Sequence, residues 1–324
     1  MATYRGISGF QIKSLASDPS NLVEGEIWYN STSGTLKVAP LVEAWSSGGT
    51  MTTARQYGGS AGIQTAAAYF GGEAGPGITG VTELYDGSAW TTSPATIPSA
   101  RNYAASGGTQ TSAYYAGGTP PATSTASYNF NGSAWTTSPG SLNTGRFISS
   151  INMGTQTAGV AVSGYGTPAK TTSYETYDGS TWATSPNSVT TGRQQYGGAG
   201  TQTAMFITGG ETPSVVSTTE ENTGAAWASG TAMPTPATDM YASGTLTAAI
   251  VSGFRGAPSV TATLGYDGTT WSAKPSMANT QWGGGCGGTS IACIAAGGAN
   301  PSPGQTAATE EFSNVATAQT VTTS

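Results

Sequence analysis

A tryptophan recurs along this chain at a nearly constant spacing. The segment YDGSAW at 85–90 returns as FNGSAW at 130–135, YDGSTW at 177–182 and YDGTTW at 266–271, with a degraded copy, NTGAAW, at 222–227. Together with Trp45, this gives tryptophans at 45, 90, 135, 182, 227 and 271, which lie 44 to 47 residues apart. A period of this length, sustained over most of a chain, predicts a repeat architecture.

Each repeat reads as four short strands, which we call a to d. In the unit between Trp90 and Trp135, strands a to d are expected at 103–106, 112–116, 125–130 and 133–135. A polar turn, Gly-Thr-Gln-Thr, separates a from b, and Asn-Gly or Asp-Gly separates c from d. Asn-Gly and Asp-Gly favour tight hairpins because both turn positions accept positive φ. The Gly-Gly that ends strand b lets the chain leave through conformations that other residues avoid.

Four strands in about 45 residues suit one blade of a β-propeller. The order of signals is an arginine, a strand, a strand ending in Gly-Gly, a variable loop, and then Tyr and Trp around a short turn. This order resembles the kelch repeat over about residues 41–314, although small residues are unusually abundant and units five and six lack the arginine. The resemblance implies an all-β fold, a six-bladed kelch-like β-propeller of four-stranded blades.

The two ends of the repeat region suggest how the ring closes. Leu41–Trp45 is a strand d with no strands a to c before it, and the last unit ends at a strand c, Glu310–Phe312. Because an open ring would leave a blade edge unpaired, we expect the N-terminal strand to complete the sixth blade. The tail Val315–Ser324 could compete for that place, but the Trp45 strand carries the repeat motif.

Residues 1–40 do not match the repeat. Ile27 and Tyr29 alternate within 26–30, and Leu36 and Val38 alternate within 35–38, which predicts a β-hairpin extension. The run LASDPSNLVEGEIWYNSTSGTLKV at 15–38 resembles segments near the N-termini of bacteriophage virion proteins, including tail-fibre and appendage proteins. The resemblance implies a docking segment at 1–40, followed by a propeller at 41–314 and a C-terminal tail at 315–324. An ordinary strand extension of a bacterial protein is the alternative.

Composition narrows the classes of partner. Only 8% of residues are charged, but the regularly placed aromatic residues argue against disorder. The net charge of −6 comes without any stripe of Lys and Arg, so no nucleic acid is expected as a partner. No apolar run approaches the roughly 20 residues that cross a bilayer, and the start MATYRGISGF lacks the pattern of a secretory signal. We therefore expect no membrane partner, and the resemblance of residues 15–38 to virion proteins implies a location in the virion.

The residues that usually carry chemistry are scarce. There is no histidine, so we expect no metal, no cofactor and no enzyme activity. Cys286 and Cys293 could form a disulfide, but two reduced core residues are favoured. The adjacent pairs Glu220-Glu221 and Glu310-Glu311 would point to opposite faces of a strand and are expected to be solvated, so they offer no acid–base pair for glycoside hydrolysis.

Four of the six arginines share one repeat position, directly before strand a. They are Arg55, Arg101, Arg146 and Arg193, and units five and six have Ala237 and Gln281 instead. The kelch resemblance would place them near one mouth of the central channel, where they could bind an anion, an acidic glycan or a carboxylate-bearing partner. The alternative, which their repetition favours, is that each arginine donates hydrogen bonds to carbonyls of the neighbouring blade.

The loops between strands b and c are the second candidate surface, because loops on a rigid scaffold commonly carry recognition. They vary in length and composition, and they span 73–80, 119–124, 165–171, 211–217, 254–259 and 299–306.

These observations predict a non-enzymatic structural protein of a bacteriophage particle. It would be part of a tail fibre or appendage or a head decoration, and it would display a propeller for adhesion or host-surface contact. Its partners would be other virion proteins through residues 1–40, a host surface glycan or receptor, or further copies of this chain. A bacterial glycan-binding adhesin is the alternative, and a polysaccharide hydrolase is a third.

Overall fold

The computed structural model describes residues 12–120, 122–149, 151–256, 260–301 and 304–322. These residues form β-strands joined by turns and loops, which confirms the predicted all-β class. Within this part of the chain, no helix is long and apolar enough to cross a membrane. The chain divides into a larger unit, Trp45–Phe312, and a smaller unit that combines Met1–Ala44 with Ser313–Ser324.

The larger unit is built from four-stranded sheets, and each repeat supplies one sheet. The first sheet contains β5 (Gly59–Ile63), β6 (Ala66–Phe70), β9 (Val81–Tyr85) and β10 (Trp90–Thr96). The second contains β11 (Asn102–Thr109), β12 (Ser112–Thr119), β13 (Ser127–Phe130) and β14 (Trp135–Thr137). The third contains β16 (Gly154–Thr155), β17 (Ala158–Val162), β19 (Tyr174–Tyr177) and β20 (Trp182–Thr184).

Three further sheets follow in the same order. The fourth contains β21 (Gly197–Thr201), β22 (Ala204–Thr208), β23 (Thr219–Asn222) and β24 (Trp227–Gly230). The fifth contains β25 (Tyr241–Thr245), β26 (Ala248–Ser252), β27 (Thr263–Tyr266) and β28 (Trp271–Lys274). The sixth contains β29 (Gly285–Gly288), β30 (Ala292–Ala296), β31 (Thr309–Ala316) and β4 (Leu41–Ser47), so its fourth strand is the one that carries Trp45.

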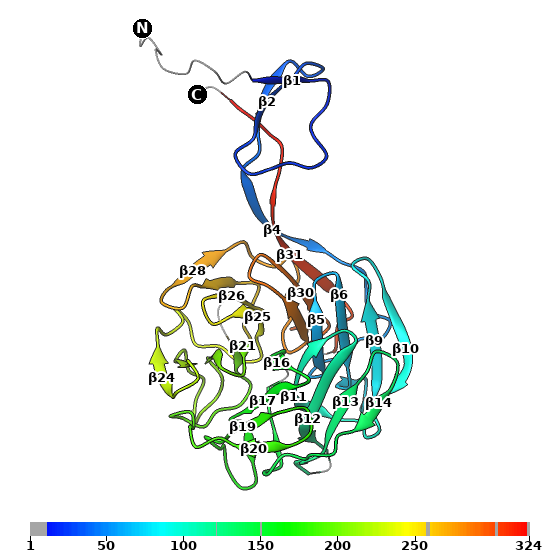
Figure 1. The fold of residues 1–324 in the computed structure, drawn as a ribbon, viewed down its shortest axis with the longest axis vertical. Helices are drawn as coiled ribbons and strands as arrows, with labels where there is room; N and C mark the ends of the chain where they lie inside the picture. Colours follow the sequence, from blue (N-terminus) through cyan, green and yellow to red (C-terminus); the bar gives the residue numbers. More distant parts are fainter. Residues whose placement is uncertain (1–11, 121, 150, 257–259, 302–303, 323–324) are drawn as a thin grey trace. The chain divides into compact units, whose positions relative to one another are not determined.

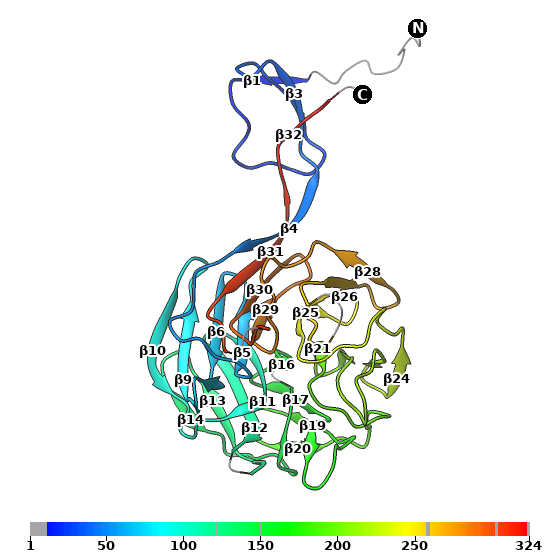
Figure 2. The same cartoon turned by 180° about the vertical axis from the view of Figure 1, so that it is seen from behind.

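The sheets of the larger unit are arranged around a common centre (Figures 1 and 2). The first strand of each repeat lies nearest this centre, and the tryptophan-bearing strands β10, β14, β20, β24 and β28 lie at the periphery. The inner strands contact one another in the order β5, β11, β16, β21, β25, β29 and back to β5. This is a propeller-like arrangement.

A glutamine in the turn between the first two strands joins each of the first four sheets to the one before it in the ring order. Gln110 Nε2 donates to the Ala67 carbonyl at 3.0 Å and to the Tyr85 carbonyl at 2.6 Å, both in the first sheet. The glutamines at 64, 156 and 202 make the same two bonds at their own positions. Gln64 of the first sheet thereby reaches Cys293 and Phe312 of the sixth. Leu246 and Ser290 hold this place in the fifth and sixth repeats.

The tryptophan series also joins neighbouring sheets. The indole N–H of Trp135 donates to Thr82 Oγ1 at 2.9 Å, and that of Trp90 donates to Thr309 Oγ1 at 2.9 Å. Trp45 donates to Thr263 Oγ1 at 3.1 Å. The Tyr or Phe of the same hairpin packs on the ring, as Phe130 does on Trp135 at 5.0 Å between centroids. The tryptophans therefore pack the sheets together, as expected of structural residues.

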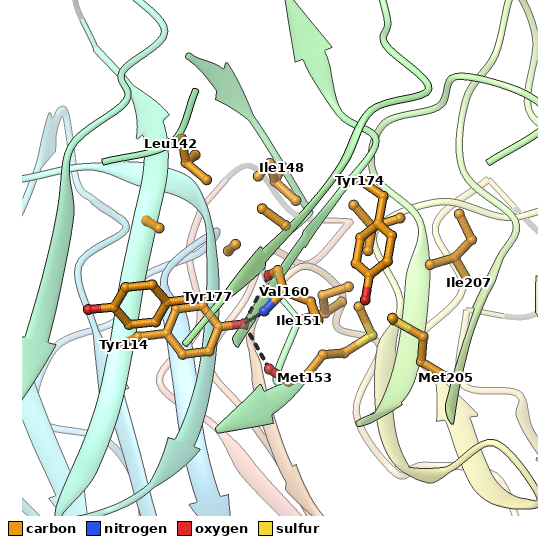
Figure 3. Close-up of a cluster of buried hydrophobic side chains, with 14 of the residues drawn as sticks. Tyr114, Leu142, Ile148, Ile151, Met153, Val160, Tyr174, Tyr177, Met205 and Ile207 are labelled. Carbon is orange, nitrogen blue, oxygen red and sulfur yellow. Dashed lines mark hydrogen bonds between the residues drawn. The ribbon is translucent and has the colours of Figure 1, made fainter. Parts of the chain in front are cut away.

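Apolar side chains fill the spaces between sheets. In the cluster of Figure 3, Tyr114 of the second sheet lies against Val160 of the third, and Met205 and Ile207 of the fourth lie on the far side. The buried Tyr114 hydroxyl donates to the Met153 carbonyl at 2.8 Å and accepts the Val160 N–H at 3.0 Å. A buried tyrosine of this kind packs like an apolar residue while its polar end is satisfied.

The double glycines have the conformation that the sequence predicts. Gly71 and Gly72 have φ of 66° and 93°, a region that favours glycine. A Cβ on Gly72 would lie 2.5 Å from the Gln56 carbonyl oxygen. In the third repeat Ser163 takes the first glycine position, with φ of 50°.

The smaller unit contains one sheet, in the order β1-β2-β3-β32. Its strands are β1 (Lys13–Leu15), β2 (Ile27–Asn30), β3 (Thr35–Val38) and β32 (Gln319–Thr320). The predicted hairpin is present as β2 and β3, in which Ile27 pairs with Val38. The tail continues β31 to Ala316 and then pairs with β3 of this sheet through β32, so both ends of the chain contribute to one unit, which differs from the three segments that we expected.

The two faces of β2 differ in exposure. Trp28 is fully buried and Asn30 is buried, whereas Ile27 is 50% exposed and Tyr29 is 41% exposed. Asp18 explains this orientation, because its Oδ1 accepts both the Trp28 indole N–H at 3.0 Å and the Asn30 amide at 2.8 Å.

Candidate functional site

The repeated arginines lie inside the sheets. Arg55 is completely buried; its Nη1 lies 3.0 Å from Glu83 Oε1, and its Nη2 donates to the Tyr69 carbonyl at 2.9 Å. Arg146 pairs with the buried Glu175 in the same way, and Arg193 pairs with Glu220 at 2.6 Å. An unpaired charge is unfavourable when it is buried, so the arginine and the glutamate of each pair depend on one another.

Arg101 of the second sheet is also buried, at 9% exposed, but it has a different partner. Its guanidinium lies 5.7 Å from the centre of the Tyr128 ring, and Tyr128 stands where four of the other sheets have a glutamate. The predicted ligand site of Arg55, Arg101, Arg146 and Arg193 is therefore wrong, because none of these side chains is open to an outside ligand. The alternative, that each arginine donates hydrogen bonds to backbone carbonyls, describes these side chains better. The carbonyls, however, belong to the arginine's own sheet and not to the neighbouring one.

The glutamates also bind the segment of backbone that precedes the first strand of their own sheet. Glu83 accepts the backbone N–H groups of Thr52 at 2.7 Å and Thr53 at 3.2 Å. Glu175, Glu220 and Glu310 accept two successive N–H groups at the equivalent positions. Our expectation that Glu220 and Glu310 are solvated is wrong, since both are buried by these contacts.

The two repeats without this glutamate also lack the N–H group that it would accept. Tyr128 and Leu264 replace the glutamate in the second and fifth sheets, and Pro98 and Pro234 stand three residues before the arginine position. Proline has no backbone N–H. The glutamate and its donor are therefore kept or lost together within this one chain.

The cysteines are reduced and buried. Cys286 pairs in register with Ala295, and Cys293 pairs with Gly288, so the two do not face one another across the hairpin. Cys286 Sγ donates to the Ala242 carbonyl at 2.9 Å, which makes it a core residue, as favoured from the sequence.

A belt of backbone hydrogen bonds connects the sheets at the position two residues after the arginine. Tyr103 N–H donates to the Tyr57 carbonyl at 2.9 Å, and Asp239 N–H donates to the Gln195 carbonyl at 2.7 Å. Gly283 donates to Asp239 and accepts from Tyr57. Tyr57, Tyr103, Gln195 and Asp239 have φ between 52° and 56°, unusual for such residues, and the belt explains the strain that they bear.

Side chains from this belt and from neighbouring segments lie close to one another. We call them the mouth cluster: Tyr57, Tyr103, Phe147, Tyr165, Gln195, Asp239 and Arg255. One half is aromatic, with Tyr57 stacked on Tyr103 at 4.2 Å between centroids and Phe147 stacked on Tyr165 at 5.3 Å. Tyr103 lies 5.3 Å from Phe147, which makes the row continuous.

The other half of the mouth cluster is polar. Asp239 Oδ2 accepts Arg255 Nη1 at 2.9 Å and Gln195 Nε2 at 3.2 Å. Burial raises the pKa of Asp239 to about 6, and the contact with Arg255 only partly offsets this. Burial also raises the pKa of Tyr57 and Tyr103, and the charge of Asp239 adds to that effect. Gly283, which donates to the Asp239 carbonyl and accepts the Tyr57 N–H, connects the two halves of the cluster. Arg255 keeps 48% of its side chain exposed.

The predicted b–c loops lie beside this cluster. The loop at 73–80 folds as a small hairpin of β7 (Glu73–Ala74) and β8 (Gly77–Ile78), and β15 (Arg146–Phe147) pairs with β18 (Tyr165–Gly166). Residues 121, 257–259 and 302–303 of these loops, and the N-terminal stretch 1–11, lie outside the described residues.

Sequence reasoning missed the mouth cluster for a physical reason. The belt position reads Tyr57, Tyr103, Ile148, Gln195, Asp239 and Gly283 through the six repeats. Its residue types differ because the backbone makes the shared contacts and leaves the side chains unconstrained. Variation at a fixed repeat position, two residues after a repeated arginine, is the signal that could have found it.

Comparison with known proteins supports the fold alone. No family model and no curated protein matches this chain. A solved structure described as the structure of YjhT is similar, with a TM-score of 0.66 and 13% sequence identity. The similarity covers 83% of this chain and 99% of that one.

Proposed function

We propose that this protein is a non-enzymatic structural component of a bacteriophage particle, attached through its smaller unit and displaying its larger unit for adhesion or host-surface contact. The distribution of exposed apolar side chains carries this proposal. Ten large apolar residues among the described ones are exposed, and seven of them belong to the smaller unit: Ile12, Val23, Ile27, Tyr29, Leu41, Val315 and Val321. Apolar side chains concentrated in this way mark protein–protein contact surfaces.

The smaller unit has the character of an attachment module in two further respects. Ile27 and Tyr29 share the outer face of β2, while Trp28 and Asn30 are held inward by Asp18. The sheet has β1 and β32 as its edge strands, and the edge of a sheet can pair with a strand of another chain. The resemblance of 15–38 to virion proteins supplies the class of partner, a protein of the particle.

We also propose that the six four-stranded sheets form a closed, six-bladed, kelch-like propeller. The contacts of Gln64 with the sixth sheet and of Trp90 with Thr309 support closure, because both join the first sheet to the last. The place of β4 beside β31 supports it as well, since the N-terminal strand then fastens the ring.

The attachment role is tested with two matched double variants. Ile27→Ser with Tyr29→Ser removes the outer apolar face of β2, and Ile63→Ser with Ile291→Ser removes comparably exposed side chains of the larger unit. Mass spectrometry of purified particles should find the wild type and the second variant, but far less of the first. Absence of the wild-type chain from purified particles, or equal incorporation of both variants, would contradict the proposal.

A bacterial glycan-binding adhesin is the second candidate, and the mouth cluster favours it. A row of aromatic rings beside a carboxylate and a half-exposed arginine offers stacking surfaces and hydrogen-bonding groups together. The whole protein on a glycan array, with Arg255→Gln and Tyr165→Ala as variants, tests this function. Binding that both variants weaken supports a glycan site at the mouth cluster, and the absence of any binding argues against it.

A further inference from the structure

The hairpin that joins the third and fourth strands of a sheet carries an amide in the second repeat and a carboxylate in three others. Asn131 and Gly132 form this turn in the second sheet, where the first, third and fifth sheets have Asp86, Asp178 and Asp267 before the same glycine. Asn131-Gly132 is the only Asn-Gly pair in the sequence. Asn131 is exposed, and Gly132 has φ of 91°, a region that favours glycine. The turn therefore requires the glycine that follows this asparagine.

The two ends of the Asn131 amide are in different environments. Its Oδ1 accepts three hydrogen bonds from the turn, from the Ser133 N–H at 3.0 Å, the Ser133 hydroxyl at 3.0 Å and the Ala134 N–H at 2.8 Å. Its Nδ2 and the backbone N–H of Gly132 make no hydrogen bond among the described residues. The carbonyl end of the amide is thus held over the backbone of the turn, while its nitrogen is free in solvent.

We propose that Asn131 is a site of spontaneous deamidation. The backbone nitrogen of Gly132, after losing its proton to solvent hydroxide, attacks Cγ of Asn131 and forms a five-membered imide. The bond between Cγ and Nδ2 then breaks, and the nitrogen takes up a proton and leaves as ammonia. Water opens the imide at either carbonyl, which gives aspartate or isoaspartate. The net reaction consumes one water, releases one ammonia and adds one negative charge, without any oxidant or reductant.

The turn favours this reaction in two ways. Attack on Cγ places negative charge on Oδ1, where the three donors already point, so they stabilise the tetrahedral intermediate as an oxyanion hole does. Glycine also has no side chain that could hinder the approach of its nitrogen. Asn143 lacks both features, because Thr144 follows it and no donor reaches its Oδ1 among the described residues. We therefore expect Asn131 to react before Asn143.

The aspartate product fits the turn, as the first sheet shows. Asp86 Oδ1 accepts the Ser88 N–H, the Ser88 hydroxyl and the Ala89 N–H, each at 2.8 Å. These hydrogen bonds, that from Ala89 foremost, lower the pKa of Asp86, so the turn favours the ionised carboxylate. Isoaspartate, in contrast, lengthens the main chain by one atom between the paired strands β13 and β14. Because the reaction needs only water, it does not depend on the attachment role or on the phage assignment.

Peptide mapping by mass spectrometry tests the proposal on the full, folded chain after incubation in neutral and in mildly alkaline buffer. The mass shift of amide-to-acid conversion should appear at Asn131, faster at the higher pH because more of the attacking nitrogen is deprotonated, while Asn143 stays intact. Asp86→Asn gives the first sheet the same Asn-Gly-Ser-Ala turn, so position 86 should then convert at a rate similar to that of Asn131. Asn131→Asp should show no conversion and should be at least as stable as the wild type at neutral pH.

Two matched variants test the role of the hydroxyl donor. Ser133→Ala removes the hydroxyl that donates to Asn131 and should slow its conversion roughly 2- to 10-fold. Ser88→Ala removes the equivalent hydroxyl in the first sheet and should leave the conversion of Asn131 unchanged. The proposal is overturned if Asn131 stays intact in the folded chain while it converts in the chain unfolded in guanidinium chloride. Equal rates at Asn131 in the two serine variants, or no conversion at position 86 of Asp86→Asn, would also contradict it.

Discussion

The third and fifth sheets fill the same buried position with opposite chemistry. In the third, Arg146 and Glu175 form an ion pair, and Glu175 also accepts the Asn143 N–H at 2.6 Å. In the fifth, Ala237 and Leu264 take the places of the two charged residues, and Pro234 takes the place of Asn143. The three positions change together because each polar group there requires the others.

This difference shows that the ion pair is one of two ways to fill the position. A buried ion pair is often no more stabilising than apolar residues of similar volume, whereas half of a pair is strongly destabilising. The fifth sheet is consistent with that rule, since all the polar partners are gone at once. The sixth sheet, with Glu310 but Gln281, is the exception.

Breaking the pair in the third sheet should have the largest effect. Glu175→Leu leaves Arg146 buried without its carboxylate and should lower the free energy of unfolding by about 3–5 kcal/mol. The triple variant Asn143→Pro, Arg146→Ala, Glu175→Leu copies the fifth sheet and should lose clearly less. Denaturant unfolding measures both, and a triple variant less stable than the single one would contradict the comparison.

The belt position provides a pH-dependent contrast between the same two sheets. The third sheet has Ile148 there and the fifth has Asp239, whose pKa burial raises to about 6. A raised pKa means that the stability contributed by this group is present below about pH 4 and is lost as the pH rises through 6. The loss amounts to up to about 3 kcal/mol. Asp239→Asn should remove this part of the pH dependence, and parallel curves for the two proteins between pH 4 and 7 would contradict the assignment.

Removing the backbone donor should cost less than breaking the ion pair. Asn143→Pro deletes the N–H that Glu175 accepts, and we expect a loss of about 1–3 kcal/mol. In a protein that already carries Arg146→Ala and Glu175→Leu, the same change should cost less, because the carboxylate acceptor is gone and only the bonds of the Asn143 side chain to the Trp182 carbonyl and Thr184 are lost. A double-mutant cycle measures the coupling, and equal costs in both backgrounds would show that the donor and the carboxylate are independent.

The turn glutamine gives the smallest of these effects. Gln110→Ala removes two hydrogen bonds to the first sheet and should cost about 1–2 kcal/mol. Gln110→Leu should cost less, because the fifth repeat has Leu246 at this position and buries it. Urea unfolding compares the stabilities of the two variants. Equal losses would mean that a leucine at this position of the second repeat does not pack as Leu246 does in the fifth.

The sequence was sufficient for the features that a periodic pattern determines. The tryptophan spacing indicated the four-stranded repeats, the Gly-Gly pairs indicated their positive φ, and the β2–β3 hairpin followed from alternation. The pattern could not give the direction of a side chain. The arginines repeat because they are structural, and a repeated position alone does not distinguish a lining residue from a buried one.

Two other features depended on contacts between distant parts of the chain. Ile27 and Tyr29 face outward because Asp18 holds Trp28 and Asn30 on the inner side. The tail forms only a two-residue strand, too short to leave a period in the sequence, and its pairing with β3 joins residues about 280 positions apart. The partnership of the glutamate with its backbone donor, by contrast, leaves a trace in the sequence, because Pro98 and Pro234 remove the donor where Tyr128 and Leu264 replace the glutamate.

The pairing of β4 with β31 has a mechanical consequence. Both connections between the two units run through these neighbouring strands, since β4 carries the chain in and β31 carries it out. A force applied through the smaller unit therefore enters the larger unit at the sixth sheet, through two adjacent strands that are pulled together.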